Sequence, residues 1–459
     1  MPDLLATLAQ ALGLPSHERP LVSFTGTGAL PSTFAVTDFA SASIAVAGLA
    51  VAELLRQQGL PVNTLEVDRR LASFWFASSL RPMGWEPAPS WDPIAGDYAT
   101  VDGWIRLHTN APHHRAAALS VLGDCAGRDA VAAAVSSWQA EVLESAVVAA
   151  GGCAAQMLDL QQWSAHPQGK AVGAEPLAAR QAGPEHAPLA WRGSRAQPLA
   201  GIKVLDLTRI LAGPVATRFL ASMGADVLRI DPPGWEEPAL APEVTLGKRC
   251  ARLDLHDSLD RISFERLLAQ ADVFVHGYRA DALEHLGYDA ARLQQLAPGL
   301  VNVSLNAYGW TGPWRNRRGF DSLVQMNTGI AAAGQRWRQA DKPVPLPVQA
   351  LDMATGYLIA AAAIDGVRER LASGRGSTSR LSLARTAKAL VDHGQVTTDL
   401  PLAAQASGDL ASQIEHTPWG PAQRLSPPLR IQGTPMQWPC PASELGSSPA
   451  TFNDALQFL

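Results

Sequence analysis

The sequence is poor in the features that mark several common protein classes. Only four of its 459 residues are cysteines, and these lie far apart with no C-x-x-C pair. We therefore expect neither a disulfide framework nor a zinc site, and we predict no other metal site. The few, scattered cysteines favour a reducing, cytoplasmic location. The start of the chain lacks the basic stretch of a signal peptide. The longest apolar runs, near 40–55 and 142–155, are shorter than the roughly 20 residues that cross a membrane. We therefore expect buried helices and no membrane partner.

Charge is also sparse and evenly spread. Charged residues make up 17% of the chain, the net charge is −5, and no basic block stands out. Nucleic acid is therefore not an expected partner, although a local basic pocket for an anionic ligand is compatible with this balance. The length and the hydrophobic content of 47% are ordinary for a globular protein of two or three domains.

One β-α-β unit dominates the middle of the chain. A short apolar run at 203–206 is followed by Pro214, which suits the first turn of a helix because its missing N–H costs nothing there. Gly224 stands where a helix C-cap favours a residue that tolerates positive φ, and 226–230 reads as a second buried strand. Such a unit implies a right-handed crossover in a parallel sheet.

Alternating strands and helices continue this pattern. We predict strands at 251–255, 271–276 and 301–305, with a helix near 259–270. This alternation is typical of an α/β fold with a Rossmann-like, doubly wound parallel sheet, accompanied here by a smaller α/β domain. Neither G-x-G-x-x-G nor a Walker A sequence is present. Ligands of such sheets nevertheless bind outside the carboxyl end of the first strand.

The amino-acid sequence of the central unit is more specific than its predicted fold. The segments LAGIKVLD at 199–206, AGP at 212–214 and MGADV at 223–227 resemble the opening of class III CoA transferases, and the segment at 428–446 resembles the closing tail of that family. This CaiB/BaiF, or formyl-CoA transferase-like, family includes carnitine CoA transferases and, with different chemistry, α-methylacyl-CoA racemases. The resemblance covers most of the chain, but its parts stand in a rearranged order.

This rearrangement divides the chain into five predicted parts. Asp38 and Asp352 each open a long apolar helix that is followed by glycine and a strand, which we interpret as an internal repeat. A hairpin signal at Asp102-Gly103 marks the family's small domain. The predicted parts are a partial repeat of the large-domain Asp-helix-strand segment at 1–83, a small α/β domain at 84–163, a linker at 164–197, a CoA-binding Rossmann-like large domain at 198–395, and a Pro-rich closing tail at 396–459.

Asp352 is the predicted catalytic residue. Local sequence alone favours an N-cap for an Asp at the start of an apolar helix. The resemblance instead implies a nucleophile that attacks an acyl-CoA thioester and forms an aspartyl anhydride and then an aspartyl-CoA thioester. We expect Gly356 to leave room for the substrate. Asp38 occupies the equivalent position in the first repeat, where we favour a capping or vestigial role over a second active carboxylate.

The resemblance also implies the residues that bind coenzyme A, which is a substrate here and not a permanently bound cofactor. CoA requires cations for its phosphates and apolar surface for its pantetheine arm. At two of these positions the chain has histidine where the family commonly has lysine or arginine. The predicted CoA-binding residues are Arg209, Leu211, Ala212, Lys248, Arg249, His256, Tyr278, Arg279 and His285.

Phe320, in the tripeptide Gly319-Phe320-Asp321, separates two subfamilies. Racemase-like members have histidine in the middle of this tripeptide, and a phenyl ring cannot move a proton. We therefore predict a CoA transferase that acts on an acyl-CoA and a carboxylic acid. The alternatives are an acyl-CoA racemase or isomerase and a non-catalytic CoA-binding protein. The resemblance further implies an interlocked homodimer.

Overall fold

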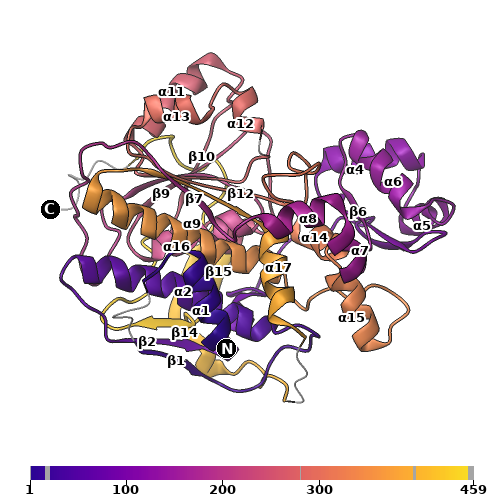
Figure 1. Ribbon diagram of the computed structural model, residues 1–459, viewed down its shortest axis with the longest axis horizontal. Helices are drawn as coiled ribbons and strands as arrows, with labels where there is room; N and C mark the ends of the chain where they lie inside the picture. Colours follow the sequence, from indigo (N-terminus) through magenta and orange to yellow (C-terminus); the bar gives the residue numbers. More distant parts are fainter. Residues whose placement is uncertain (1, 16–20, 280, 396–399, 453–459) are drawn as a thin grey trace.

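A seven-stranded sheet forms the centre of the molecule (Figure 1). The computed structural model describes residues 2–15, 21–279, 281–395 and 400–452. The strand order across the sheet is β10-β9-β8-β11-β12-β13-β7. These strands are β8 (Lys203–Leu207), β9 (Asp226–Asp231), β10 (Arg249–Arg252), β11 (Val273–His276), β12 (Val301–Asn306), β13 (Ser377–Ser382) and β7 (Ala179–Ala182).

The first six strands of this order are parallel, and their sequence is that of a doubly wound sheet. Numbered from β8, the order is 3-2-1-4-5-6, and the direction of winding reverses between β8 and β11. The predicted α/β class and Rossmann-like topology are therefore confirmed. β7 pairs antiparallel with β13 at the edge. β7 lies in the segment 164–197, which we predicted to be a linker. This segment therefore contains regular structure that was not predicted.

Helices cover both faces of the sheet. On one face lie α9 (Ala212–Ser222) and α16 (Ala350–Ser373), and on the other lie α11 (Ser258–Gln270), α12 (Ala282–His285) and α13 (Ala290–Leu296) (Figure 1). Side chains of successive residues in β8 enter different cores, because Val204 packs on the α9 side and Leu205 on the α11 side. The shorter helices of this half are α10 (Ala241–Val244), α14 (Asp321–Asn327), α15 (Ile330–Arg338) and α17 (Leu383–His393).

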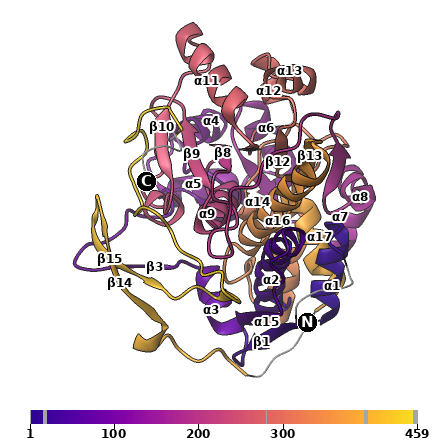
Figure 2. The same ribbon diagram turned by 90° about the vertical axis from the view of Figure 1, so that its left-hand side faces the viewer.

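The helix of the first repeat lies against the helix of the second. α2 (Val36–Gln57) runs beside α16, as both views show (Figures 1 and 2). Both helices are long and apolar enough to cross a membrane by length and composition alone, but 94% and 100% of their most apolar windows are buried in the fold. This burial is that of core helices, which agrees with the interpretation of the apolar run at 40–55.

A small lobe stands beside the sheet. Its antiparallel strands are β4 (Gly96–Ala99), β5 (Trp104–Leu107) and β6 (Ala154–Gln156), and it carries α4 (Pro112–Leu122), α5 (Arg128–Val135) and α6 (Ala140–Ala149). The hairpin predicted at Asp102-Gly103 is present. A turn at 136–139 separates α5 from α6. Helices α7 (Leu160–Ala165) and α8 (Pro167–Ala174) follow the lobe.

Two further three-stranded sheets join the ends of the described chain. In one, β1 (Leu21–Thr25) and β2 (Thr64–Asp68) pair in parallel and β16 (Leu429–Ile431) adds antiparallel. In the other, β14 (Leu410–Thr417) and β15 (Gly420–Leu425) form a hairpin that pairs with β3 (Leu80–Pro82) (Figure 2). The remaining elements are α1 (Pro2–Ala11), α3 (Arg69–Trp75) and the 3₁₀ turn at Ser407–Asp409.

Candidate active site

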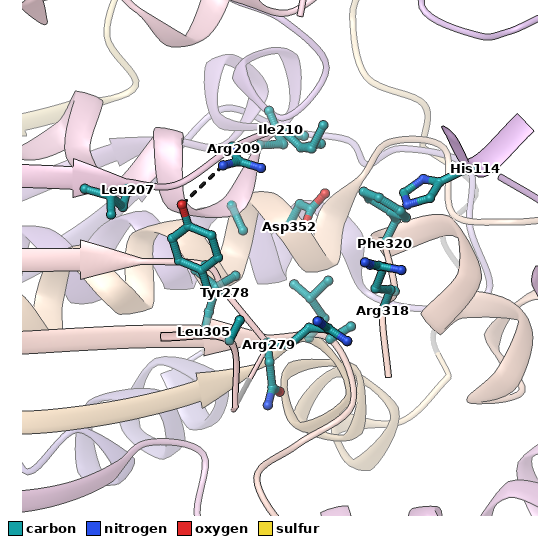
Figure 3. A pocket seen from close by; sticks show the side chains of 18 of the residues that line it. His114, Leu207, Arg209, Ile210, Tyr278, Arg279, Leu305, Arg318, Phe320 and Asp352 are labelled. Carbon is teal, nitrogen blue, oxygen red and sulfur yellow. Dashed lines mark hydrogen bonds between the residues drawn. The ribbon is translucent and has the colours of Figure 1, made fainter. Parts of the chain in front are cut away.

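A cavity of about 380 Å³ opens at the carboxyl ends of β8, β11 and β12 (Figure 3). These strands are neighbours at the point where the winding of the sheet reverses, which is where open α/β sheets bind their ligands. The strand ends contribute Leu207, Arg209, Gly277, Tyr278, Leu305 and Asn306 to its wall. Helix α16 contributes Asp352.

Asp352 lies in the first turn of α16 and is only 5% exposed. The N-cap residue of α16 is Gln349, which makes no side-chain capping bond, so the local prediction of an Asp352 cap is wrong. The cap is supplied by a different helix. Asp321, the first residue of α14, accepts hydrogen bonds of 2.9 Å from the amides of Leu351 and Asp352.

These two carboxyl groups influence each other strongly. Burial raises the pKa of Asp352 well above its usual value, and the neighbouring Asp321 raises it further. Burial also raises the pKa of Asp321, although its hydrogen bonds oppose this shift. Because the N-terminal amides of α16 are already bonded to Asp321, they do not hold Asp352 in its charged form. Burial and the charge of Asp321 therefore disfavour an ionised Asp352.

Arg209 is held across the pocket by two aromatic rings. Its guanidinium carbon lies 4.8 Å from the centre of the Trp235 ring and 5.4 Å from that of Tyr278, and one of its N–H groups donates to the Tyr278 hydroxyl at 3.2 Å. Arg279 lines the same cavity. The predicted Arg209, Tyr278 and Arg279 are thus brought together with Asp352.

The turn after Arg209 brings α9 to the pocket. Leu211 and Ala212, both predicted to contact CoA, line the cavity at the start of α9. Ile210 precedes them with φ of +68°, a conformation that costs a β-branched residue free energy. Its amide donates to Glu237 at 2.7 Å, which helps to hold this turn.

Lys248 is placed differently from its predicted role. Its ammonium group is buried, with Nζ 3.1 Å from Asp206 and 2.9 Å from the carbonyl oxygen of Pro214. It joins β8 to α9 from within the core and does not reach the cavity. Arg249 also points elsewhere, since it pairs with Asp226 at 2.8 Å.

The two predicted histidines lie outside the cavity as well. His256 is exposed, and His285 is 74% exposed with Nδ1 3.9 Å from Asp281. The geometry of the described pocket therefore gives neither imidazole a contact with a ligand bound beside Asp352. Contacts of His256 and His285 with the CoA phosphates stay a prediction, and they would involve a part of CoA that extends beyond this cavity.

Gly356 also serves a purpose other than the predicted one. A Cβ atom at this position would stand 2.6 Å from the carbonyl oxygen of Ala212 and 2.9 Å from Val215. The missing side chain therefore allows α9 and α16 to approach each other closely one turn after Asp352. It makes room for a helix, not for the substrate.

Comparison with known proteins identifies the family. The model of CoA-transferase family III matches residues 199–438, which is more than half of the chain. The chain belongs to CoA-transferase family III. The resemblance seen in the sequence is thus confirmed.

Relatives in family III differ in how much of their length this chain spans. An acyl-CoA transferase of Gibberella moniliformis is 27% identical over 403 residues, 78% of this chain and 70% of its own. Human succinyl-CoA:glutarate CoA-transferase is 29% identical over 239 residues, 49% of this chain and 52% of its own. A crystal structure of Rv3272 from Mycobacterium tuberculosis, 30% identical, covers 43% of this chain and 56% of its own with a TM-score of 0.40. The chain thus spans about half the length of most of these relatives.

Phe320, which the resemblance predicts to separate transferase-like from racemase-like members, lines the cavity. Its ring stacks on His108 at a centroid distance of 3.8 Å and meets the edge of His114 at 5.8 Å. Both histidines come from the small lobe, and burial lowers the pKa of His108 to about 3 and of His114 to about 4. The phenyl ring therefore packs against two neutral imidazoles, and His114 lines the cavity together with it.

His113, His114, Trp235 and Arg318 line the cavity but were not predicted from the sequence. Trp235 lies in the loop after β9, whereas the two histidines come from the start of α4 in the small lobe. Their approach to Asp352 depends on how the lobe docks, which no local pattern encodes. The only hint of these residues in the sequence was that two histidines stand next to each other.

Asp38 in the first repeat lies at a second cavity of about 400 Å³. It is the third residue of α2 and forms an ion pair with Arg69, so the predicted N-cap role is wrong here too. Arg69 is the one Lys or Arg among the described residues that line this cavity, and Asp38 neutralises it. The described residues that line the second cavity therefore offer no free cation for the phosphates of CoA.

Proposed function

We propose that this protein is a CoA transferase that moves CoA from an acyl-CoA to a carboxylic acid, with Asp352 as the nucleophile. The observation that carries this proposal is a buried carboxyl group that shares one pocket with Arg209, Tyr278 and Arg279 at the switch point of the sheet. Family membership supports the general chemistry. The named substrates of the relatives, among them succinyl-CoA, glutarate and oxalate, show the range of this chemistry in those proteins.

The first half of the reaction loads CoA onto the protein. The Asp352 carboxylate attacks the thioester carbonyl and expels the CoA thiolate, which leaves an acyl-aspartyl anhydride. The thiolate then attacks the aspartyl carbonyl of this anhydride. The donor acid leaves as its carboxylate, and Asp352 becomes an aspartyl-CoA thioester.

The second half is the same chemistry in reverse. The acceptor carboxylate attacks the aspartyl thioester and expels the thiolate, and this thiolate attacks the acceptor carbonyl of the new anhydride. The new acyl-CoA leaves and the Asp352 carboxylate is restored. Each step exchanges one acyl bond for another, so no external oxidant, reductant or net proton is required.

The burial of Asp352 in the pocket wall fits its proposed role as a nucleophile. A desolvated carboxylate is a stronger nucleophile than a hydrated one, and its raised pKa reflects this desolvation. Arg209 is available to offset the charge of the CoA phosphates, and it contacts the rings of Trp235 and Tyr278, which together form an aromatic wall. We propose that this wall holds the nucleotide end of CoA.

Intact mass spectrometry with hydroxylamine tests this proposal. Hydroxylamine converts an aspartyl thioester or anhydride into a stable hydroxamate, so the attacked residue keeps a mass tag. We expect the tag with a reactive acyl-CoA in wild type and in Asp38→Ala, and its loss in Asp352→Ala. A tag that depends on Asp38 instead would assign the reaction to the other repeat.

An acyl-CoA racemase is the second candidate, and the two neutral imidazoles of His113 and His114 favour it. Burial lowers the pKa values of both rings and keeps them neutral, and a neutral imidazole has a lone pair that can accept a proton from the α-carbon of a thioester. Exchange of the α-proton of an acyl-CoA with solvent deuterium, without a hydroxamate tag, would support this candidate. The tag without exchange supports the transferase.

A further inference from the structure

Glu237 connects the two loops that build the aromatic end of the pocket. Its carboxylate oxygen Oε1 accepts a hydrogen bond of 2.7 Å from the amide of Ile210, in the loop after β8. The same oxygen accepts a bond of 2.8 Å from the indole Nε1 of Trp235, in the loop after β9. One carboxylate oxygen therefore holds both sides of the contact between Arg209 and the Trp235 ring.

A buried ion pair fixes this carboxylate to the central sheet. Glu237 is only 5% exposed, and its other oxygen, Oε2, accepts a hydrogen bond of 2.8 Å from Arg229 of β9. Arg229 is fully buried and also donates two bonds to Asp231, the last residue of β9. Charge-assisted hydrogen bonds between buried groups are strong and have defined geometry. The position of Glu237 is therefore set by the sheet and not by the loops that it joins.

The loop after β8 needs such support because Ile210 is strained. Its φ is +68°, a conformation that β-branched residues rarely adopt. A strained residue keeps its conformation only where its surroundings hold it, and the hydrogen bond from the Ile210 amide to Glu237 is such a contact. Because Arg209 directly precedes Ile210, the same bond restricts where its guanidinium lies.

Glu237 supports the wall of the pocket from behind. Arg209, Trp235 and Tyr278 line the cavity, whereas Glu237 is not among the described residues that do. Figure 3 shows Arg209 and Tyr278 facing each other at this end of the pocket. Since Arg229 balances the charge of Glu237, the carboxylate adds little repulsion toward an anionic ligand.

We propose that Glu237 is a positioning residue for coenzyme A, which holds the Arg209 turn and the Trp235 ring ready for the nucleotide end of CoA. This inference rests on the proposed function, which places that end of CoA at the aromatic wall. A site that is ordered before binding loses less entropy when its ligand arrives. Glu237 therefore contributes to nucleotide affinity without touching the nucleotide. It does not affect the pantetheine end, because the thiol must reach Asp352.

Calorimetry with the two ends of coenzyme A tests this role. The probes are CoA, adenosine 3′,5′-bisphosphate, which carries the nucleotide end, and pantetheine, which carries the thiol end. We expect Glu237→Ala to weaken CoA and bisphosphate binding about 10-fold, the loss typical when side chains must be ordered on binding, and to leave pantetheine unchanged. Arg229 keeps Asp231 as a partner in this variant. Glu236→Ala, at the adjacent exposed carboxylate, is the matched control.

A double-mutant cycle keeps the test decisive if Glu237→Ala does not fold. Glu237→Gln retains the shape of the side chain but has one acceptor oxygen for the three donors, and Trp235→Phe retains a ring without the indole N–H. Residues that act through one another lose less affinity together than the sum of their separate losses. We expect this non-additive loss of CoA affinity. Additive losses, or no loss in Glu237→Gln, would overturn the proposed role.

The outcomes separate this role from the proposed function. Equal losses for the bisphosphate and for pantetheine in Glu237→Ala would overturn the inference, because Glu237 would then serve the fold as a whole. Unchanged CoA affinity in Glu237→Ala, or a wild type that does not bind the bisphosphate, would overturn it as well. A selective loss of nucleotide binding, in a protein whose wild type gives no hydroxamate with any acyl-CoA, supports the inference and contradicts only the chemistry assigned to Asp352.

Discussion

Asp321 shows how one buried side chain can set the reactivity of another. It is fully buried and accepts hydrogen bonds from the amides of Leu351 and Asp352 and from the side chain of Gln325. It therefore fixes the start of α16 and places a negative charge next to the nucleophile. We regard Asp321 as a positioning residue for Asp352.

Asp321→Asn should shift the pH dependence of the reaction. Removing the neighbouring charge lowers the pKa of Asp352, so its carboxylate persists to more acidic pH. The acid limb of the kcat/KM profile, and of hydroxamate formation, should move to lower pH. A purely structural role would reduce the rate equally at every pH, so an unmoved acid limb would contradict this prediction.

Lys248 tests whether a residue implied by family resemblance binds CoA or stabilises the core. Lys248→Met removes the buried partner of Asp206, and breaking such a pair costs roughly 3–5 kcal/mol. We expect a clear fall in Tm, with the KM for acyl-CoA unchanged in the protein that stays folded. Lys342→Met, at an exposed position, is the control for the loss of charge. A higher KM at unchanged stability would restore the predicted phosphate contact.

At the scale of helices and strands, local patterns predicted much of the large domain. Local geometry restricts the residue type in the strand at 203–206, at the helix start near Pro214 and at Gly224. The structure has β8, α9 and β9 at the places that these residues predict. The cap expected at Asp38 was wrong, because α2 begins two residues earlier and Asp38 pairs with Arg69, which is distant in sequence. Local sequence alone would have made the same error at Asp352, whose neighbour Asp321 is also distant in sequence. A lysine beside a glycine looks the same in sequence whether it is buried or exposed. For this reason the burial of Lys248 could not be predicted.

Gly356→Ala tests the close approach of α9 and α16. A methyl group there has no room, since the Ala212 carbonyl oxygen lies 2.6 Å from its ideal position. We expect α9 to shift, with a lower Tm from overpacking of roughly 1–3 kcal/mol. Because Arg209 and Leu211 precede α9, kcat/KM should fall as well. Gly103→Ala, in a turn with open space around it, should change neither quantity.

At the scale of the whole molecule, the two helices that were interpreted as a repeat lie side by side. α2 packs on α16, and Asp38 and Asp352 are each the third residue of their helix. They face cavities of similar size, but only the cavity at Asp352 has Arg209, Arg279 and Arg318 in its wall. The interlocked homodimer implied by the resemblance stays a prediction, and native sizing as a dimer would support it.

Glu144 of α6 is one of the residues that join the small lobe to the large domain. Its carboxylate is buried and lies 2.8 Å from Arg317, and it also accepts a hydrogen bond of 3.0 Å from Asn327 of α14. Glu144→Gln keeps the shape but removes the charge that balances the buried Arg317. Because an unpaired buried charge is costly, we expect a fall in stability of roughly 3 kcal/mol.

The same change should loosen the end of the pocket that the lobe builds and leave the Asp352 end intact. Because the nucleotide end of CoA is proposed to lie at the opposite wall, of Trp235 and Tyr278, we expect the KM for the acceptor acid to rise more than the KM for acyl-CoA, and hydroxamate formation at Asp352 to persist. Glu141→Gln, one turn earlier on the exposed face of α6, is the control. If both KM values rise equally, the lobe supports the pocket as a whole and does not serve the acceptor end alone.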